Sequence, residues 1–214
     1  MPRASKAPNL TRAAVVEAAA AVLERDGHGG LTLRAVATEL KVQAPALYWY
    51  FDDKQALELA LFDHLMAGLT FAPKGLDWQA DLRDMARALR THLTSRRDLG
   101  KLPPTGFFFT PQAAALMEAA LGVMLNAGLA PRAAFYAFVT LADYVTNWSK
   151  AEGEMRSRAD QRPGVDPIAK AALTDGTYPN LARVALEFTR TDSIDEHFNL
   201  GLEVQIAGIA SLAP

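Results

Sequence analysis

Residues 29–61 of this 214-residue chain read GGLTLRAVATELKVQAPALYWYFDDKQALELAL. Thr32 can cap a helix near the start of this stretch. The apolar side of that helix is formed by Leu33, Val36, Ala37 and Leu40. Pro45 is acceptable only in the first turn of a helix, so it places the start of a second, very short helix over residues 43–49. Two helices joined by so short a turn have the dimensions of a helix-turn-helix, whose second helix enters the major groove of DNA.

The exposed residues of these two helices suit contacts with base edges. Gln43 can hydrogen-bond a base edge, and Arg34 is the best candidate for a bidentate contact with guanine. Small side chains beside Gln43 let the backbone approach the bases and can touch thymine methyl groups; these residues are Ala44, Pro45 and Ala46.

Three consecutive aromatic residues, Tyr48, Trp49 and Tyr50, cannot all point into a core. A hydroxyl or an indole N–H at a helix end is suited to a phosphate oxygen. Lys54, in the first turn of the next helix, can add its ammonium group there. A helical hairpin with surface aromatics would show the same spacing, so spacing alone leaves both interpretations open.

Helical periodicity dominates the rest of the chain, and we expect an all-α fold without strands or internal repeats. Gly27 is the expected stop of the first helix. Residues 153–177 are rich in Gly, Pro and Asp, which predicts a mobile loop. The remaining expected helices cover residues 11–26, about 52–69, about 78–95, about 111–127, about 131–152, about 178–188 and about 193–212.

Composition excludes several classes of protein. The chain has no cysteine, which rules out a disulfide framework, cysteine-ligated zinc and thiol catalysis. Its net charge is −2, so any contact with DNA must come from where the charges lie. A membrane-spanning helix needs about 20 apolar residues, and the longest uncharged stretch is interrupted by prolines. The first residues lack the apolar centre of a signal peptide, so we expect a cytoplasmic protein.

The stretch GGLTLRAVATELKVQAPALYWYFDDKQALELAL resembles the DNA-binding segment of the TetR family of bacterial transcriptional regulators. PALYWYF followed by DDKQAL is most similar to the branch that contains the tetracycline repressor. The similarity continues, more weakly but in the same order, through DWQADL, SRRDLGK and AGLAPRAAFYAF.

The resemblance implies a homodimer with a helix-turn-helix head in residues 1–54 and a ligand-binding and dimerisation domain in residues 55–214. Ala44 and Tyr50 stand where that branch has glutamine and histidine, so we expect a different operator sequence. Lys41 stands where many relatives have glycine; if its backbone is left-handed, the cost is about 1 kcal/mol. The DNA contacts implied by the resemblance are Thr32, Arg34, Gln43, Ala44, Pro45, Ala46, Tyr48, Trp49, Tyr50 and Lys54.

A polar stripe runs along the helix expected at residues 131–152 and is a candidate wall of a ligand pocket. A solvent-exposed face or a polar dimer seam would show the same pattern. The stripe consists of Tyr136, Thr140, Asp143 and Asn147. Other candidate walls are Met85, Leu89, His92, Pro103, Phe107, Met117 and Leu121, although Phe107 and its neighbours could instead plug the core.

The tetracycline repressor branch holds a magnesium–drug chelate, and the resemblance places its two metal-binding positions at Pro103 and Ala151. Neither side chain can ligate a metal. Met85 and Leu89 replace the two residues that hold the drug in that branch. We therefore expect a different inducer, no metal and no cofactor. The histidines at 64, 92 and 197 also show no metal-binding spacing.

The last helix is expected to form the dimer with the helix at 131–152, as a four-helix bundle. Gly201 and Gly208, seven residues apart, would allow close approach of two helices. A core helix within one subunit is the alternative. The stripe assigned to the dimer contact consists of Phe198, Leu202, Gln205, Ile209 and Leu212.

The sequence thus favours a repressor that a small molecule releases from operator DNA. A ligand-independent or activating regulator of the same fold is the main alternative. An enzyme would need an acid–base pair such as Asp143 with His92, and the chain shows no nucleophile motif, phosphate loop or metal spacing.

Overall fold

Helices form all the regular secondary structure in the residues that the computed structural model describes, which are 10–102, 110–157, 176–180, 182–183 and 193–214. The all-α expectation is therefore confirmed for this part of the chain. In chain order the α-helices (α) and 3₁₀ helices (η) of the described residues include α1 (Arg12–Gly30), α2 (Leu33–Glu39), η1 (Ala44–Trp49), α3 (Lys54–Met66), α4 (Trp78–Thr94), η2 (Leu99–Lys101), α5 (Pro111–Asn126), α6 (Pro131–Ser157) and α9 (Ile194–Ala210).

Side-chain caps set the starts of most of these helices. Thr11 accepts a hydrogen bond from the backbone N–H of Ala14, and Thr32 accepts one from Ala35. Both caps are those that the sequence predicts, because a hydroxyl oxygen satisfies an N–H that has no partner in the first turn. The other side-chain caps are Asp53, Asp77, Thr110 and Ser193.

Two backbone positions decide the shape of the N-terminal helices. Gly27, with φ of 72°, breaks α1 but does not end it, since helical residues continue to Gly30. Lys41 has φ of 57°, the left-handed conformation considered for this position, and it lies in the turn between α2 and η1. Pro45 lies in the first turn of η1, and this short element is a 3₁₀ helix.

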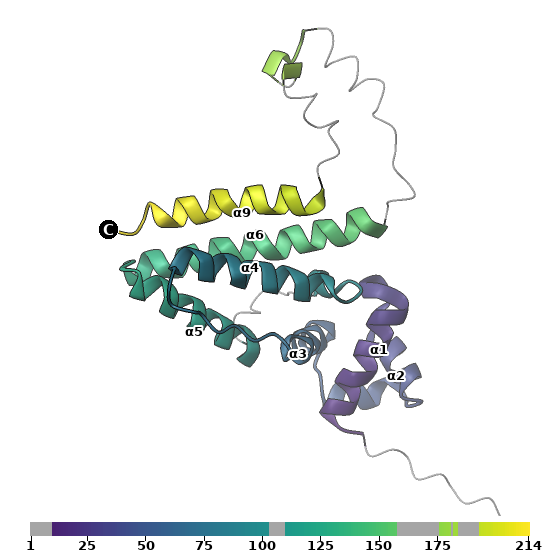
Figure 1. The fold of residues 1–214 in the computed structure, drawn as a ribbon. Helices are drawn as coiled ribbons and strands as arrows, with labels where there is room; N and C mark the ends of the chain where they lie inside the picture. The colour runs from purple at the N-terminus through teal and green to yellow at the C-terminus, as the bar shows by residue number, and fades with distance from the viewer. Residues whose placement is uncertain (1–9, 103–109, 158–175, 181, 184–192) are drawn as a thin grey trace, which may run out of the picture.

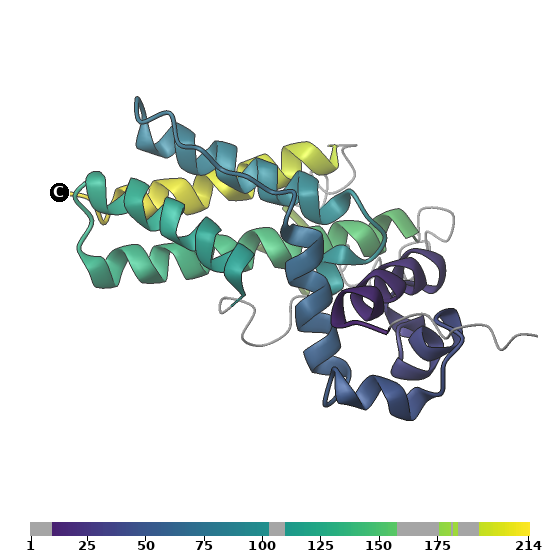
Figure 2. The ribbon, with the colours of Figure 1, turned by 90° about the horizontal axis from the view of Figure 1, so that it is seen from below.

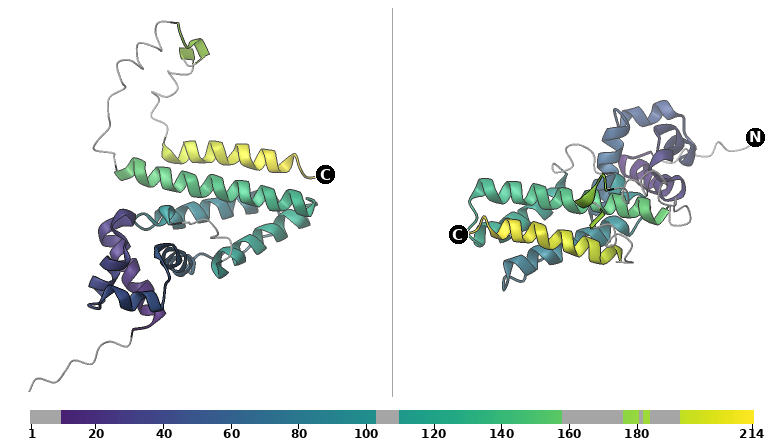
Figure 3. Two further views of the ribbon diagram at one scale, coloured as in Figure 1. Left: turned by 180° about the vertical axis from the view of Figure 1, so that it is seen from behind. Right: turned by 90° about the horizontal axis from the view of Figure 1, so that it is seen from above.

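The helices form a head and a body, with α3 between them (Figures 1 and 2). α1, α2 and η1 make the head, and α4, α5, α6 and α9 make the body. α6 and α9 run antiparallel and side by side along one side of the body (Figure 3). One contiguous hydrophobic core extends from the first helix to the last, from Val15 to Ile209.

One expected boundary was wrong, and one expected helix lies mostly outside the described residues. The loop expected from residue 153 begins later, because α6 continues to Ser157. Most of the helix expected at 178–188 lies outside the described residues, as do Pro103 and Phe107. No helix in the described ranges is long and apolar enough to cross a membrane.

Candidate nucleic-acid interface and ligand site

The 3₁₀ helix η1 presents two large aromatic side chains to solvent. Trp49 is 89% exposed and Tyr48 is 56% exposed. Leu47 and Phe51, on the other side of the same segment, are buried in the core. The short helix is therefore held by two apolar anchors while its aromatic surface stays open for a partner.

Tyr50 is held by the chain itself. Its hydroxyl donates a hydrogen bond of 2.6 Å to the carbonyl of Leu10, and its own carbonyl accepts one of 2.9 Å from Arg12. The Arg12 guanidinium also lies 4.3 Å from the centre of the Phe51 ring. Tyr50 thus ties the end of η1 to the start of α1, a structural role that the sequence did not indicate.

The cations beside η1 differ in their partners. Arg34 on α2 is exposed, and its guanidinium has no hydrogen bond or ion pair among the described residues. Lys54 Nζ lies 3.2 Å from Glu58 Oε1, and the same oxygen lies 2.9 Å from His28 Nε2. Arg34 is therefore the freer of the two cations for contact with DNA.

The remaining residues assigned to DNA differ in exposure. Gln43 and Pro45 are exposed, whereas Ala44 and Ala46 are partly buried. Thr32 is exposed, but its hydroxyl oxygen already accepts the capping bond from Ala35. Small side chains next to exposed polar and aromatic ones suit close approach to base edges.

The described residues assigned to the ligand differ in burial. Met85 and Leu89 are buried in the core, and Met117 and Leu121 are partly buried against it. His92 contacts the Leu65 carbonyl through Nε2 at 2.8 Å.

The polar stripe on α6 lies elsewhere. Tyr136 is 57% exposed, and a hollow of about 420 Å³ is shared by Thr140, Asp143, Asn147 and Gln205 of α9. The stripe faces outward beside α9, so its position fits the alternative of a solvent face or dimer seam better than that of a pocket wall. Within the described residues, Asp143 makes no hydrogen bond or ion pair with His92, whose Nε2 contacts the Leu65 carbonyl.

The stripe on α9 that we expected to form the dimer contact is mostly internal. Phe198, Leu202 and Ile209 are buried within the subunit, which corrects the role expected for these three residues from dimer contact to subunit core. Gly201 likewise approaches Tyr144 of the same chain. The apolar residues that α9 leaves exposed are instead Leu200 at 71% and Val204 at 65%.

Salt bridges hold α9 and α6 against α4. Arg83 makes a bidentate contact with Glu203, with N–O distances of 2.8–3.1 Å, and this hydrogen bonding lowers the pKa of Glu203. Arg90 bridges Glu152 on α6 and Asp195 on α9 at 2.7 and 2.6 Å. Glu152 is only 1% exposed, so Arg90 compensates a buried charge.

No three His, Cys, Asp or Glu side chains gather as a metal site within the part of the chain that the structure describes. Ala151, one of the two positions matched to metal ligands, lies on α6 and has no ligating atom.

Comparisons with known proteins match nearly the whole chain. Residues 15–61 match the family described as bacterial regulatory proteins, tetR family, and residues 72–213 match the tetracyclin repressor-like C-terminal domain. Tetracycline repressor protein class G of Vibrio anguillarum is 29% identical over 208 residues, covering 95% of each chain. The class D repressor of Escherichia coli is 30% identical over 207 residues, covering 93% of this chain and 88% of that protein.

A solved structure shares the fold. ActR of Streptomyces coelicolor in complex with actinorhodin superimposes with a TM-score of 0.79 at 26% identity, covering 96% of this chain and 98% of ActR.

Proposed function

Because the chain belongs to the tetR family of bacterial regulatory proteins and is therefore a DNA-binding transcriptional regulator, we propose that it is a homodimeric repressor. The proposed repressor acts in the cytoplasm, where bacterial DNA lies. A small organic molecule other than a magnesium–tetracycline chelate releases it from its operator.

The exposed aromatic surface of η1 is the observation that carries this proposal. Tyr48 and Trp49 of η1 are exposed, and so is Arg34 of α2, whose guanidinium has no partner among the described residues. Arg34 reads a guanine, the aromatic residues and Lys54 hold phosphates, and the small residues of η1 let the backbone approach the bases. Two such heads must lie about 34–36 Å apart to meet successive major grooves.

The outer face of α6 and α9 is the proposed dimer contact. Leu200 and Val204 expose apolar side chains on α9, and Gln205 of the same helix shares a hollow with Asp143 and Asn147 of the polar stripe. Exposed apolar patches rimmed by polar residues mark interaction sites. The stripe on α6 is accordingly reassigned from the ligand to the partner subunit.

The inducer is proposed to bind against the apolar residues of α4 and α5, namely Met85, Leu89, Met117 and Leu121. Small-ligand sites are typically lined by such residues. Two observations support an inducer other than a metal chelate: Ala151 cannot ligate a metal, and the similar protein ActR is found with actinorhodin. Release requires only that the ligand bind the conformation with low DNA affinity more tightly than the one with high DNA affinity. Each tenfold change in DNA affinity needs a difference of about 1.4 kcal/mol in ligand binding free energy.

Fluorescence anisotropy with the duplex upstream of the protein's own gene tests the proposal. The double variant Tyr48→Ala/Lys54→Ala should weaken binding at least tenfold, because it removes two phosphate contacts. Tyr178→Ala/Lys74→Ala removes the same residue types from exposed positions outside the head and should leave affinity unchanged. Undiminished binding by the head variant would refute the proposed interface.

Binding that no candidate small molecule reverses would instead favour a ligand-independent regulator. Turnover of a candidate ligand would point to an enzyme.

A further inference from the structure

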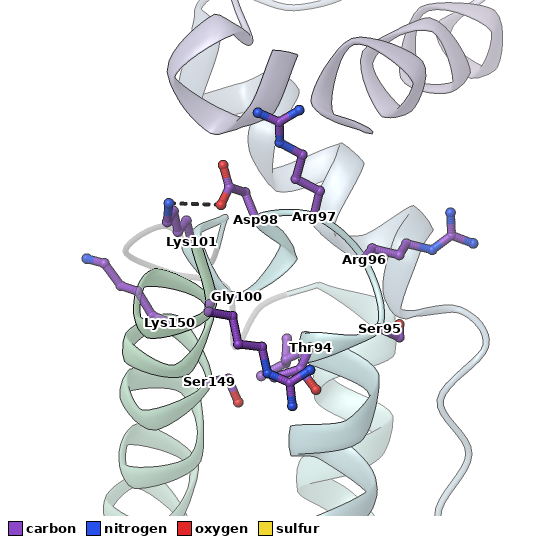
Figure 4. Close-up of a pocket in the computed structure, with 12 residues that line it drawn as sticks. Thr94, Ser95, Arg96, Arg97, Asp98, Gly100, Lys101, Ser149 and Lys150 are labelled. Carbon is purple, nitrogen blue, oxygen red and sulfur yellow. Dashed lines mark ion pairs between the residues drawn. The ribbon is translucent and has the colours of Figure 1, made fainter. Parts of the chain in front are cut away.

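A hollow of about 440 Å³ lies in the body next to the head, between the end of α4, η2 and the end of α6 (Figure 4). We call it the basic hollow. Among the described residues, its lining has five cationic side chains and one carboxylate, that of Asp98. The cations are Arg96, Arg97, Lys101, Lys150 and Arg156. The whole chain has a net charge of −2, so this concentration of positive charge is local.

Three of the five cations are already partnered. Arg97 donates to the carbonyls of Glu24 and Arg25. Lys101 Nζ lies 2.8 Å from Asp98 Oδ1, and Arg156 pairs with Glu152.

Arg96 and Lys150 have no ion pair or hydrogen bond from their side chains within the described ranges. Both residues are exposed, and Figure 4 shows their side chains pointing away from each other on opposite sides of the hollow. Long, flexible side chains of this kind can turn inward when a charge arrives.

The hydroxyl groups in the lining already donate hydrogen bonds to backbone carbonyls, so the cations are the donors left for a ligand. Thr94 donates to the Arg90 carbonyl at 2.9 Å, Ser95 to the His92 carbonyl at 2.7 Å, and Ser149 to the Val145 carbonyl at 2.8 Å. Their protons are therefore committed to the helices that carry them. Guanidinium and ammonium groups remain as the donors, and their strongest partners are carboxylate and phosphate oxygens.

The close packing of η2 on α6 keeps the basic hollow in shape. A Cβ on Gly100 would lie 3.3 Å from the Lys150 backbone nitrogen, a tight contact, so glycine eases the close approach of these two segments. Asp98 adopts a left-handed conformation with φ of 55° and accepts a 2.9 Å hydrogen bond from the backbone N–H of His28. The rim of the hollow therefore rests on the head.

We propose that the basic hollow binds a small oxyanion with at least two negative charges, either a polycarboxylate or a phosphate. A cavity lined by charges of one sign concentrates counter-ions, and charge-assisted hydrogen bonds from several cations favour a multivalent ligand over chloride. The site is distinct from the proposed inducer wall on α4 and α5, and it takes a different class of ligand.

Calorimetric titration with citrate and with inorganic phosphate, at constant ionic strength set by chloride, tests the proposal without DNA. The wild-type protein should bind at least one probe saturably, and the preferred probe identifies the source of the oxyanion. Lys150→Glu and Arg96→Glu should each weaken that binding at least tenfold, because each places a negative charge at the rim.

Arg132→Glu is the matched control, since it makes the same charge change on α6 at an exposed position that does not line the hollow. It should leave the affinity within twofold of wild type. Circular dichroism confirms folding of every variant. An NMR titration should shift amide signals of residues 94–101 and 149–156 first.

Three results would overturn the proposal. One is the absence of saturable binding of both probes. Another is equal weakening by Arg132→Glu, which would show attraction to overall charge. The third is an NMR response centred outside these segments.

Discussion

Gly201→Ala tests whether the glycine on α9 serves packing within one subunit. A Cβ at this position would overlap the hydroxyl of Tyr144 and lie 2.8 Å from Cζ of the same ring. The ring cannot easily move, because its hydroxyl donates a 2.7 Å hydrogen bond to the Phe198 carbonyl and the ring stacks on Phe198 with centroids 5.6 Å apart. The substitution must therefore disturb α6 or α9.

The expected change in the free energy of unfolding is the sum of opposing contributions. Alanine is favoured over glycine in a helix interior by about 1 kcal/mol. Overpacking in a filled core costs about 1–3 kcal/mol, and loss of the Tyr144 hydrogen bond adds about 1 kcal/mol. Gly201→Ala should therefore destabilise the fold by about 1–3 kcal/mol. Gly122→Ala on α5, where a Cβ would meet nothing within 4 Å, should stabilise it by about 0.5–1 kcal/mol.

Urea denaturation at one fixed protein concentration measures both effects, since association makes apparent stability depend on concentration. The two variants should differ by roughly 1.5–4 kcal/mol, with opposite signs relative to wild type. Adding Tyr144→Phe to Gly201→Ala should recover part of the loss, because it removes the overlapping hydroxyl. Equal stabilisation by Gly201→Ala and Gly122→Ala would refute the packing argument.

Three other perturbations test further contacts. Arg90→Met should cost about 2–3 kcal/mol in urea denaturation, because it leaves the buried carboxylate of Glu152 with fewer partners. The double variant Arg90→Met/Glu152→Gln should recover most of that loss, and no recovery would contradict the role of Arg90. Burial raises the pKa of Asp98, but hydrogen bonds from Lys101 and from the His28 N–H outweigh it and hold the pKa below its ordinary value. The stability that this carboxylate contributes is therefore full at neutral pH and lost as the pH falls through the lowered pKa. The advantage of wild type over Asp98→Asn in thermal unfolding should shrink on acidification, and a pH-independent difference would show that the charge is not involved. A Cβ on Gly208 would meet nothing within 4 Å in its own subunit. Gly208→Ala should therefore leave subunit stability unchanged. It should weaken dimerisation, measured by sedimentation, because the added methyl group would meet the partner subunit. Unchanged dimerisation would place Gly208 outside the seam.

Local features of the fold could be read from the sequence because they depend on residues three or four apart. The caps at Thr11 and Thr32 and the placement of Pro45 in the first turn of η1 are of this kind. Each satisfies or removes a backbone N–H in the first turn of its own helix, so no distant residue is needed to recognise it.

The burial of α9 could not be read in the same way. The periodic stripe containing Phe198 and Leu202 shows only that one side of the helix is covered, and a core and a dimer seam require the same pattern. The contact that shows why residue 201 is glycine is made with Tyr144, 57 positions earlier in the chain. Helix periodicity carries no information about such a distant pair.

The polar stripe on α6 was ambiguous for the same reason. Its spacing defines one face of a helix, but Asp143 and Asn147 could equally have faced a pocket or the surface. The anchoring of Asp98 to the His28 N–H was also out of reach, because it joins a left-handed residue in a loop to a helix end 70 residues away.

Native mass spectrometry of the protein on the duplex upstream of its own gene, combined with footprinting, tests the central claim most directly. Two chains per duplex and two protected half-sites about 10 base pairs apart, centre to centre, are expected for paired heads in successive major grooves. A single chain per duplex, or no complex with any duplex, would contradict the account.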